Sequence, residues 1–285
     1  MTGYRPYLAL LPAVLLLGVL FAGGLSFAVL ESVQGPNGTF SLEHYRALLV
    51  EPELRESIVY TLLLSSVATG ISTALGLLAA LTLRRFSRGS RLLTILVQLP
   101  LAVPHLAMAV LVLDVLGQSG LIARLFHLAG STKQPSDFPE LLHDRFGVGI
   151  LVTYILKETP FITLVALAAL RRSIGDYEAV AATLGASAWQ RFRHVTLPLI
   201  APSLISAALM VFAFVFGSFE VGFLLGRSYP PLLGVLVQRR YMSTELADRP
   251  DAIAAGVLMS IVSAVFVFAY LRLSVRLVGE RPVLF

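Results

Sequence analysis

Four ionisable side chains lie inside otherwise apolar stretches of the chain: Asp114, Lys157, Glu158 and Glu220. Charges within hydrocarbon are costly, so such residues are functional candidates by default. Lys157 and Glu158 are neighbours and point about 100° apart on a helix, so we do not expect them to face each other. These four residues are candidates for lining a pathway, and of Lys157 and Glu158 one could line it while the other pairs with a second helix. The structural alternative is bonding between helices or exposure at the headgroups.

The remaining chemistry-bearing residues form no catalytic or metal-binding motif. The chain has no cysteine, which excludes disulfides, thiolate metal sites and cysteine nucleophiles. It also has no G-x-x-x-x-G-K-[ST] phosphate-binding loop, so it cannot bind ATP in that manner. His105 follows Pro104, and we expect it to be a packed, hydrogen-bonded side chain. We therefore predict no catalytic centre, no metal site and no cofactor in this chain.

The elements that position these residues are long apolar helices. The chain is 56% hydrophobic and only 14% charged, against about 25% charged in a soluble domain. Its apolar blocks are long enough to cross a bilayer, which takes about 20 helical residues, and they do not alternate as strands would. The predicted spans are Tyr7–Leu30, Ile58–Leu83, Leu92–Leu116, Phe146–Leu170, Pro198–Gly226 and Ala252–Leu271. We predict an all-α integral membrane protein with six transmembrane helices.

The first span could also be a signal peptide. Its apolar run is longer than a signal-peptide core, which has about 7–15 residues, so we expect it to be retained as an anchor.

Lysines and arginines predict the orientation, because cytoplasmic loops carry an excess of them. With the N-terminus inside, the inside segments carry twelve and the longer outside segments carry nine. The turn "RRFSRGSR", residues 84–91, is the densest inside group. The net charge of +5 is therefore interpreted as a topology signal and not as a nucleic-acid footprint. We predict a multi-pass protein of a bacterial inner membrane with both termini in the cytoplasm.

The domain organisation follows from these spans. Residues 1–56 are predicted to hold the first membrane helix and an external amphipathic segment, Ser41–Leu49, with apolar positions at helical spacing. Residues 57–276 form a core of five membrane helices with a cytoplasmic loop at about 171–198. Residues 277–285 form a cytoplasmic tail.

The loop contains the stretch "DYEAVAATLGASAWQRFRHVTLPL", residues 176–199. It predicts a short alanine-rich helix over Ile174–Leu184, ended by Gly185, and a second helix capped by Ser187. Pro198 is predicted to break the helical hydrogen bonds. The first helix either docks into a groove on a cytoplasmic partner or lies on the lipid surface. The residues alone leave both alternatives open.

This stretch resembles the EAA loop of the membrane subunits of ABC importers, the binding-protein-dependent permeases. The family pattern is Glu-Ala-Ala, three residues, Gly, nine residues, an aliphatic residue, one residue and Leu-Pro. From Gly185 onward the match is complete. Upstream, Glu178 lies seven residues before Gly185 and not six, and Ala179 takes the usual glutamate position. One residue is about 100° on a helix, so we expect Glu178 to face a different direction.

The segments "LPLAVPHLAMAV", "YILKETPFI" and "FEVGFLLG" are similar to the spermidine/putrescine permeases and to related iron, phosphonate and thiamine systems. The resemblance implies a type I ABC importer permease fold with a cytoplasmic coupling helix. It implies that this chain and a second permease, a copy or a different chain, form the pathway. Separate cytoplasmic ATPase subunits would bind ATP and Mg, and an external binding protein would deliver a small polar solute, polyamine-like by preference. The implied ATPase-coupling residues are Glu178, Ala179, Ala182, Gly185, Ala186, Ser187, Leu197 and Pro198.

Two other functions are compatible with the residues. One is an ion- or proton-coupled carrier that uses Lys157, Glu158 and Glu220 as coupling groups. The other is a membrane scaffold whose cytoplasmic helix binds a partner. Dependence of transport on ATP would favour the ABC importer.

Overall fold

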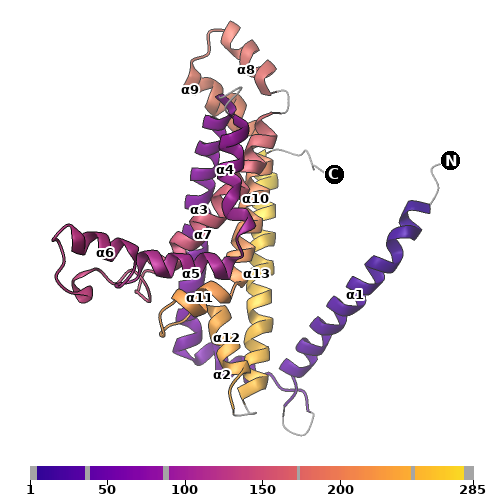
Figure 1. Ribbon diagram of the computed structural model, residues 1–285. Helices are drawn as coiled ribbons and strands as arrows, with labels where there is room; N and C mark the ends of the chain where they lie inside the picture. Colours follow the sequence, from indigo (N-terminus) through magenta and orange to yellow (C-terminus); the bar gives the residue numbers. More distant parts are fainter. Residues whose placement is uncertain (1–4, 36–38, 86–89, 172–173, 245–247, 279–285) are drawn as a thin grey trace.

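A computed structural model describes residues 5–35, 39–85, 90–171, 174–244 and 248–278 (Figure 1). Its long helices are α1 (Arg5–Ser32), α3 (Pro52–Arg85), α7 (Val148–Leu170), α10 (Leu197–Gly217) and α13 (Asp248–Val278). The shorter ones are α2 (Glu43–Val50), α4 (Ser90–Ala102), α5 (His105–Leu116), α6 (Leu121–Leu128), α8 (Ile174–Thr183), α9 (Ala188–Arg191), α11 (Glu220–Leu225) and α12 (Leu233–Tyr241). A 3₁₀ turn, η2 (Pro135–Asp137), and a π-helical turn, η3 (Phe192–Thr196), complete the described elements.

The described residues contain six helical runs long and apolar enough to span a membrane. The prediction of an all-α fold with six membrane helices is confirmed. Most of the predicted tail, together with residues 86–89 of the arginine-rich turn and 172–173 of the loop, lies outside the described residues.

The third predicted span, Leu92–Leu116, is wrong as a single helix. Helix α4 ends at Ala102, and α5 starts at His105, directly after Pro104. Proline lacks an N–H and restricts the residue before it, so the helix cannot pass through this point unbroken. Figure 1 shows α4 lying along the bundle, whereas α5 and α6 extend sideways from it. The apolar run at this place is instead His105–Leu128.

The fifth predicted span, Pro198–Gly226, is also interrupted. Helix α10 ends at Gly217, Ser218 is extended with a ψ of 153°, and α11 begins at Glu220. Glycine is a poor helix former, and its presence at this end accounts for the stop.

The core of the bundle is built on closely packed α3 and α7. A stripe of small residues on α3 is buried at a spacing of three or four: Ser57, Thr61, Ser65, Ala68 and Ser72. One turn further, a Cβ on Gly76 would lie 2.7 Å from Ile162 Cγ2 and 3.1 Å from the Thr159 carbonyl oxygen. Small residues let helix backbones approach closely where lipid supplies no hydrophobic force between helices. This contact fixes α7, and with it Lys157 and Glu158, against α3.

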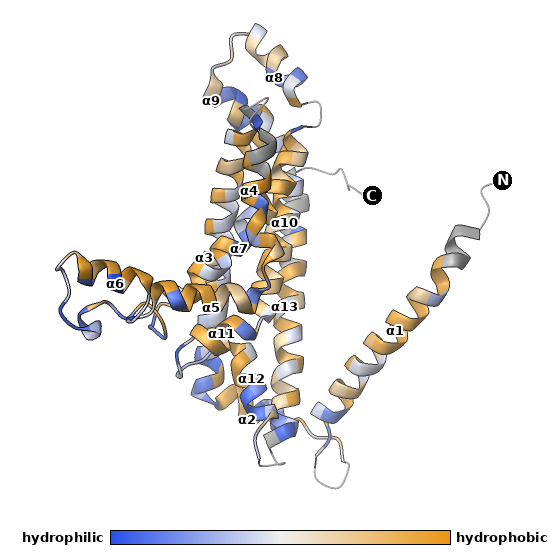
Figure 2. Ribbon diagram, viewed as in Figure 1, coloured by the Kyte–Doolittle hydropathy of each residue, from blue (hydrophilic) through white to orange (hydrophobic). Residues whose placement is uncertain are grey.

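Helices α4, α5, α10 and α11 pack against α7, and α10 also packs against α3. Helices α10, α12 and α13 form a second apolar cluster with α2, whose Leu48 is buried. The predicted amphipathic segment is therefore a helix with one buried apolar position, while Leu42 and Leu49 stay exposed. Helix α1 leans away from the bundle (Figure 1), packs against α13 and keeps its apolar side chains exposed. Figure 2 shows apolar residues along the long helices and hydrophilic ones around α2 and α12.

Candidate coupling helix and transport pathway

Helix α8 ends where the sequence predicts. Gly185 has a φ of 85°, a conformation that favours glycine. The Gly185 N–H donates to the Ala182 carbonyl and the Ala186 N–H donates to the Ala181 carbonyl, both at 3.0 Å. These two bonds form a Schellman motif, which satisfies the last carbonyls of a helix. The helix end at Gly185 is confirmed.

Helix α9 begins with the predicted cap. The Gln190 N–H donates to Ser187 Oγ at 3.3 Å, and the Ser187 N–H donates to Gln190 Oε1 at 2.8 Å. This reciprocal pair is a capping box. The end of α8 and the start of α9 are therefore both fixed by local hydrogen bonds.

Pro198 interrupts the regular α-helical hydrogen bonding, as predicted, but the chain stays helical across it. Helix α9 continues through η3 into α10, and Pro198 lies in the first turn of α10. The Leu197 N–H donates to the Phe192 carbonyl, five residues back. The wider π-helical turn places proline, which has no N–H to donate, at a helix start where none is needed.

Helix α8 has an inner and an outer face. Ile174 is buried and joins the main apolar core. Tyr177, Val180 and Leu184 are 59%, 61% and 83% exposed, and they follow one another at spacings of three and four. The predicted coupling residues Ala179, Ala182, Gly185, Ser187 and Pro198 are exposed, and Ala186 and Leu197 are half-buried. The helix thus presents an apolar outer stripe.

Glu178 lies on the inner face, one turn after Ile174. Its Oε2 accepts a hydrogen bond from Arg84 Nη2 at 2.7 Å, and its Oε1 accepts one from Thr196 Oγ1. Burial raises the pKa of this carboxyl, but the hydrogen bonds from Arg84 and Thr196 and the nearby positive charges outweigh it, so the pKa is lowered. Glu178 therefore points toward the bundle.

Lys157 is buried and caps the end of another helix. Its Nζ donates to the carbonyl oxygens of Pro100, Leu101 and Val103 at 2.8, 3.3 and 2.5 Å. The last carbonyls of a helix lack partners within it, and a cation there also suits the helix dipole. Lys157 therefore stabilises the end of α4, which is the structural alternative of bonding between helices.

Glu158 holds the other side of the same break. Its Oε1 lies 3.0 Å from Nε2 of His105, the first residue of α5. The His105 ring also packs against Phe214, with the ring centroids 4.6 Å apart. The predicted packed, hydrogen-bonded His105 is confirmed, as is the expectation that Lys157 and Glu158 do not face each other. Together the two neighbours fix both ends of the α4–α5 break.

Asp114 and Glu220 differ from this pair because both are exposed. Neither forms an ion pair with the residues that the structure describes. Near Glu220, the Tyr154 hydroxyl and Ser218 Oγ are hydrogen-bonded, which ties α7 to the α10–α11 break. Sequence reasoning missed Tyr154 and Ser218; the glycine before Ser218 was the available signal. The four predicted pathway residues therefore form a buried structural pair and two free acids.

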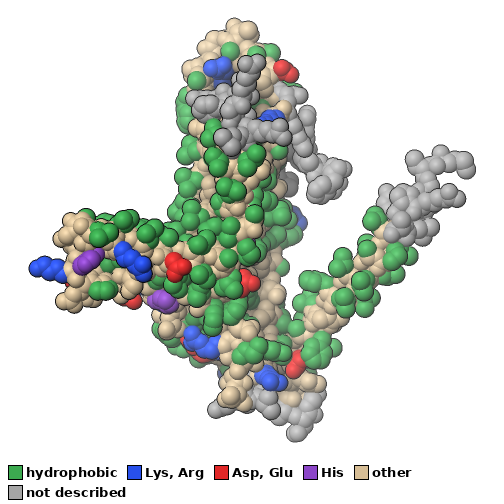
Figure 3. Space-filling view, in the orientation of Figure 1, with side chains coloured by type: hydrophobic (Ala, Val, Ile, Leu, Met, Phe, Trp, Pro, Cys, Tyr) green, Lys and Arg blue, Asp and Glu red, His purple; other side chains and the backbone are tan. Residues whose placement is uncertain are grey.

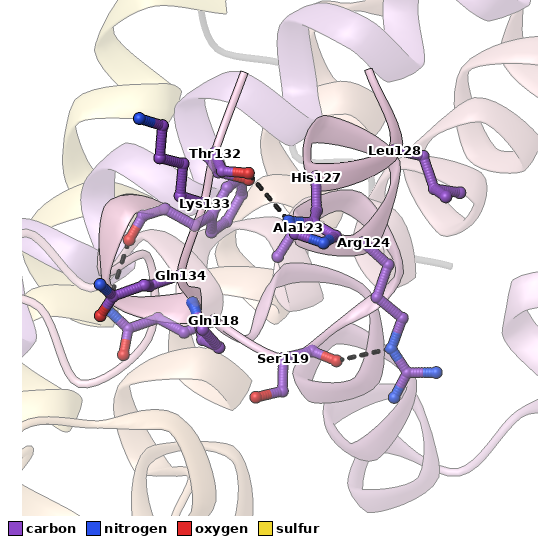
Figure 4. A pocket seen from close by; sticks show the side chains of 11 residues that line it. Gln118, Ser119, Ala123, Arg124, His127, Leu128, Thr132, Lys133 and Gln134 are labelled. Carbon is purple, nitrogen blue, oxygen red and sulfur yellow. Dashed lines mark hydrogen bonds between the residues drawn. The ribbon is translucent and has the colours of Figure 1, made fainter. Parts of the chain in front are cut away.

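A separate cavity of 580 Å³ lies on the α6 arm (Figure 4). The residues that line it lie between Gln118 and Phe138, and none of the four pathway candidates is among them. Arg124 Nε donates to the Ser119 carbonyl at 2.9 Å, and His127 Nδ1 lies 2.8 Å from the Thr132 carbonyl. Figure 3 shows basic side chains and a histidine along this arm. Over the described part of the chain, no three His, Cys, Asp or Glu side chains are grouped to hold a metal.

Comparison with known proteins identifies the family. Residues 72–279 match the family described as "Binding-protein-dependent transport system inner membrane component". The Escherichia coli "Inner membrane ABC transporter permease protein YnjC" is 29% identical over 233 residues, which cover 81% of this chain but only 43% of that protein. The Mycobacterium tuberculosis "Molybdenum transport system permease protein ModB" is 29% identical over 223 residues, which cover 78% of this chain and 80% of that protein.

The fold agrees with this assignment. A chain of a bacterial alginate ABC transporter, solved "in complex with alginate pentasaccharide-bound periplasmic protein", superimposes with a TM-score of 0.80 at 21% identity, covering 97% of this chain and 96% of that one. Members of the matched family are transport components and not catalysts. The chain belongs to the binding-protein-dependent inner membrane components, and it is a permease subunit of an ABC importer.

Proposed function

We propose that α8 is the docking helix for a cytoplasmic ATPase subunit, which binds the ATP and Mg that power this permease. The apolar outer stripe of Tyr177, Val180 and Leu184 carries this proposal. Figure 1 shows α8 and α9 projecting past the ends of the long helices, a position that favours a protein partner over the lipid surface. The opposite face of α8 is fixed to the bundle, so the stripe is held in place for a partner.

This proposal requires the α8 end of the bundle to lie in the cytoplasm. The density of arginines in residues 84–91 supports that orientation, with both termini on the same side. Because the chain has no cysteine, a single Ser187→Cys label tests it in whole cells. Protection from a membrane-impermeant maleimide is expected, and labelling from outside would refute the orientation.

Two matched glycine substitutions test the docking. Gly185→Arg places a charged side chain at the positive-φ end of α8, and we expect it to abolish co-purification of the partner ATPase. Gly175→Arg is the control, because Gly175 is also exposed on α8, has open space around it and has no positive φ. Stoichiometric ATPase with the Gly185→Arg variant would refute the docking surface.

We further propose that the solute is an oxyanion of the molybdate class, delivered by an external binding protein to a pathway formed with a second permease subunit. The support is the ModB relative, which this chain matches over most of both lengths. The free acids Asp114 and Glu220 favour a cation of the polyamine type as the second candidate.

Uptake measurements separate these solutes. Cells that carry the whole gene cluster are expected to accumulate radiolabelled molybdate, and putrescine uptake in its place would favour the second candidate. Uptake should stop when ATP is depleted and should survive collapse of the ion gradients. Uptake that follows the gradients would instead support an ion-coupled carrier.

A further inference from the structure

We propose that Glu178, Arg84 and Thr196 form a clasp that transmits movement of α8 to both α3 and α10. The inference rests on the proposed docking of an ATPase on α8. It assigns to Glu178 a positioning role inside this chain and not a contact with the ATPase.

The geometry of the clasp joins three elements through one carboxylate. Each oxygen of Glu178 accepts a hydrogen bond from a different element: Oε2 from Arg84 in the last turn of α3, and Oε1 from Thr196 at the end of η3. The Arg84–Glu178 distance is 2.7 Å. Because the two oxygens belong to one rigid planar group, a shift of α8 displaces both partners together.

Partial burial strengthens the hydrogen bonds of the clasp. The side chains of Glu178 and Arg84 are 17% and 31% exposed, and Thr196 is almost fully buried. A hydrogen bond to an ionised carboxylate is roughly twice as strong as a neutral one. A partly sheltered pair is also less screened by salt than an exposed one. The clasp is therefore stiffer than an ordinary surface ion pair.

The position of the clasp matches a transmission role. The backbone of α8 packs closely against η3 and α9, and the Arg84 bridge connects it to α3. Helix α3 packs along α7, whose Lys157 and Glu158 fix the α4–α5 break. Thr196 lies in a π-helical turn, an element often found at functional sites, and α10 follows it directly. A movement of α8 can thus reach α10 along the chain, through α9 and η3, and can reach α3 through the Arg84–Glu178 ion pair.

A single cysteine on α10 can report the transmitted movement, since the native chain has none. Gly217→Cys suits this purpose, because Gly217 is exposed at the far end of α10 and has open space around it. The complex with the co-purified ATPase is placed in nanodiscs. The rate of reaction with a methanethiosulfonate reagent is measured with and without ATP plus vanadate.

We expect the trapped nucleotide to change this rate. In the Glu178→Gln background the nucleotide-dependent change is expected to fall about 5-fold, with ATPase binding unaffected. Arg84→Glu combined with Glu178→Arg should restore most of the change, because the ion pair is rebuilt with reversed polarity. Thr196→Val should also weaken the response, since it removes the bond nearest α10. Asp176→Asn, an exposed acid on the same helix, is the control and should leave the response intact.

Several results would overturn the clasp. A full nucleotide response with Glu178→Gln would show that the carboxylate transmits nothing. Loss of the ATPase from that variant would place Glu178 in the docking surface. An unresponsive Gly217→Cys in the otherwise native chain would show that α10 does not receive the movement. Failure of the native chain to bind an ATPase would instead refute the proposed function itself.

Discussion

The close contact of α3 and α7 predicts opposite effects for two glycines on the same helix. Gly76 and Gly70 both lie in α3, but a Cβ on Gly70 meets nothing within 4 Å, whereas a Cβ on Gly76 meets α7. Replacing each by alanine adds the same single methyl group. The two variants therefore separate helix packing from helix propensity.

The magnitude follows from the distances. The new methyl group of Gly76→Ala would lie 2.7 Å from Ile162 Cγ2, where ordinary contact starts at 3.4 Å, so α3 and α7 must shift apart. Ile162 is buried and β-branched, and the next neighbour is a backbone carbonyl, so neither can turn aside. Overpacking of this kind costs about 1–3 kcal/mol, while alanine gains about 1 kcal/mol over glycine within a helix. We expect Gly76→Ala to be about 2 kcal/mol less stable than Gly70→Ala.

The free energy of unfolding is measured in mixed micelles by titration with SDS, followed by far-ultraviolet circular dichroism. Fluorescence of the single tryptophan is a poor substitute, because Trp189 lies on α9 and is 64% exposed. If Gly76→Ala unfolds at the same SDS fraction as Gly70→Ala, the account of α3–α7 packing is wrong.

Three further predictions concern the charged residues. Lys157→Met should lower the free energy of unfolding by about 2 kcal/mol, because it removes a charged donor from three carbonyls. An unchanged free energy of unfolding together with lost uptake would instead assign Lys157 to solute contact. Glu158→Gln should lower uptake several-fold while ATPase co-purification persists, and undiminished uptake would remove Glu158 from the pathway candidates. Because the pKa of Glu178 is depressed, its ion pair stabilises the fold above the ordinary value of 4.5 and is lost as the pH falls through the lowered value. The stability difference between the native chain and Glu178→Gln should therefore be constant above about pH 4.5 and shrink as the pH falls below it, through the lowered pKa; a difference that persists in acid would contradict this.

The sequence predicted six spans because long apolar runs have few alternatives to a membrane helix, but it did not predict the breaks after Ala102 and Gly217. It also located the helix end at Gly185 and the cap at Ser187, since both are local events decided by one or two residues. It predicted that Pro198 would break the helical hydrogen bonds, but it did not predict the π-helical turn through which the helix continues. Periodicity carries no information about such a change of helical register.

The pathway candidates show a second limit of prediction from the sequence, which is the identity of distant partners. The charges at Lys157 and Glu158 were visible, but their partners lie more than fifty residues away, at the α4–α5 break. Only the packed structure shows that these charges fix helix ends. The sequence did not predict the inward direction of Glu178, and it carried no signal for Arg84 or Thr196 as its partners.

The α4–α5 break also has a consequence for chimaeras between permeases. The turn at Val103 and Pro104 is held by hydrogen bonds from two adjacent side chains of α7, Lys157 and Glu158. If a segment covering α4 to α6 is exchanged alone, it loses its contacts with Lys157 and Glu158 of α7. Helices α5 and α6 would then no longer be held in their direction relative to the bundle. Recombinants that retain function should therefore inherit residues 100–105 and 157–158 from the same parent, although the two stretches are far apart in the gene.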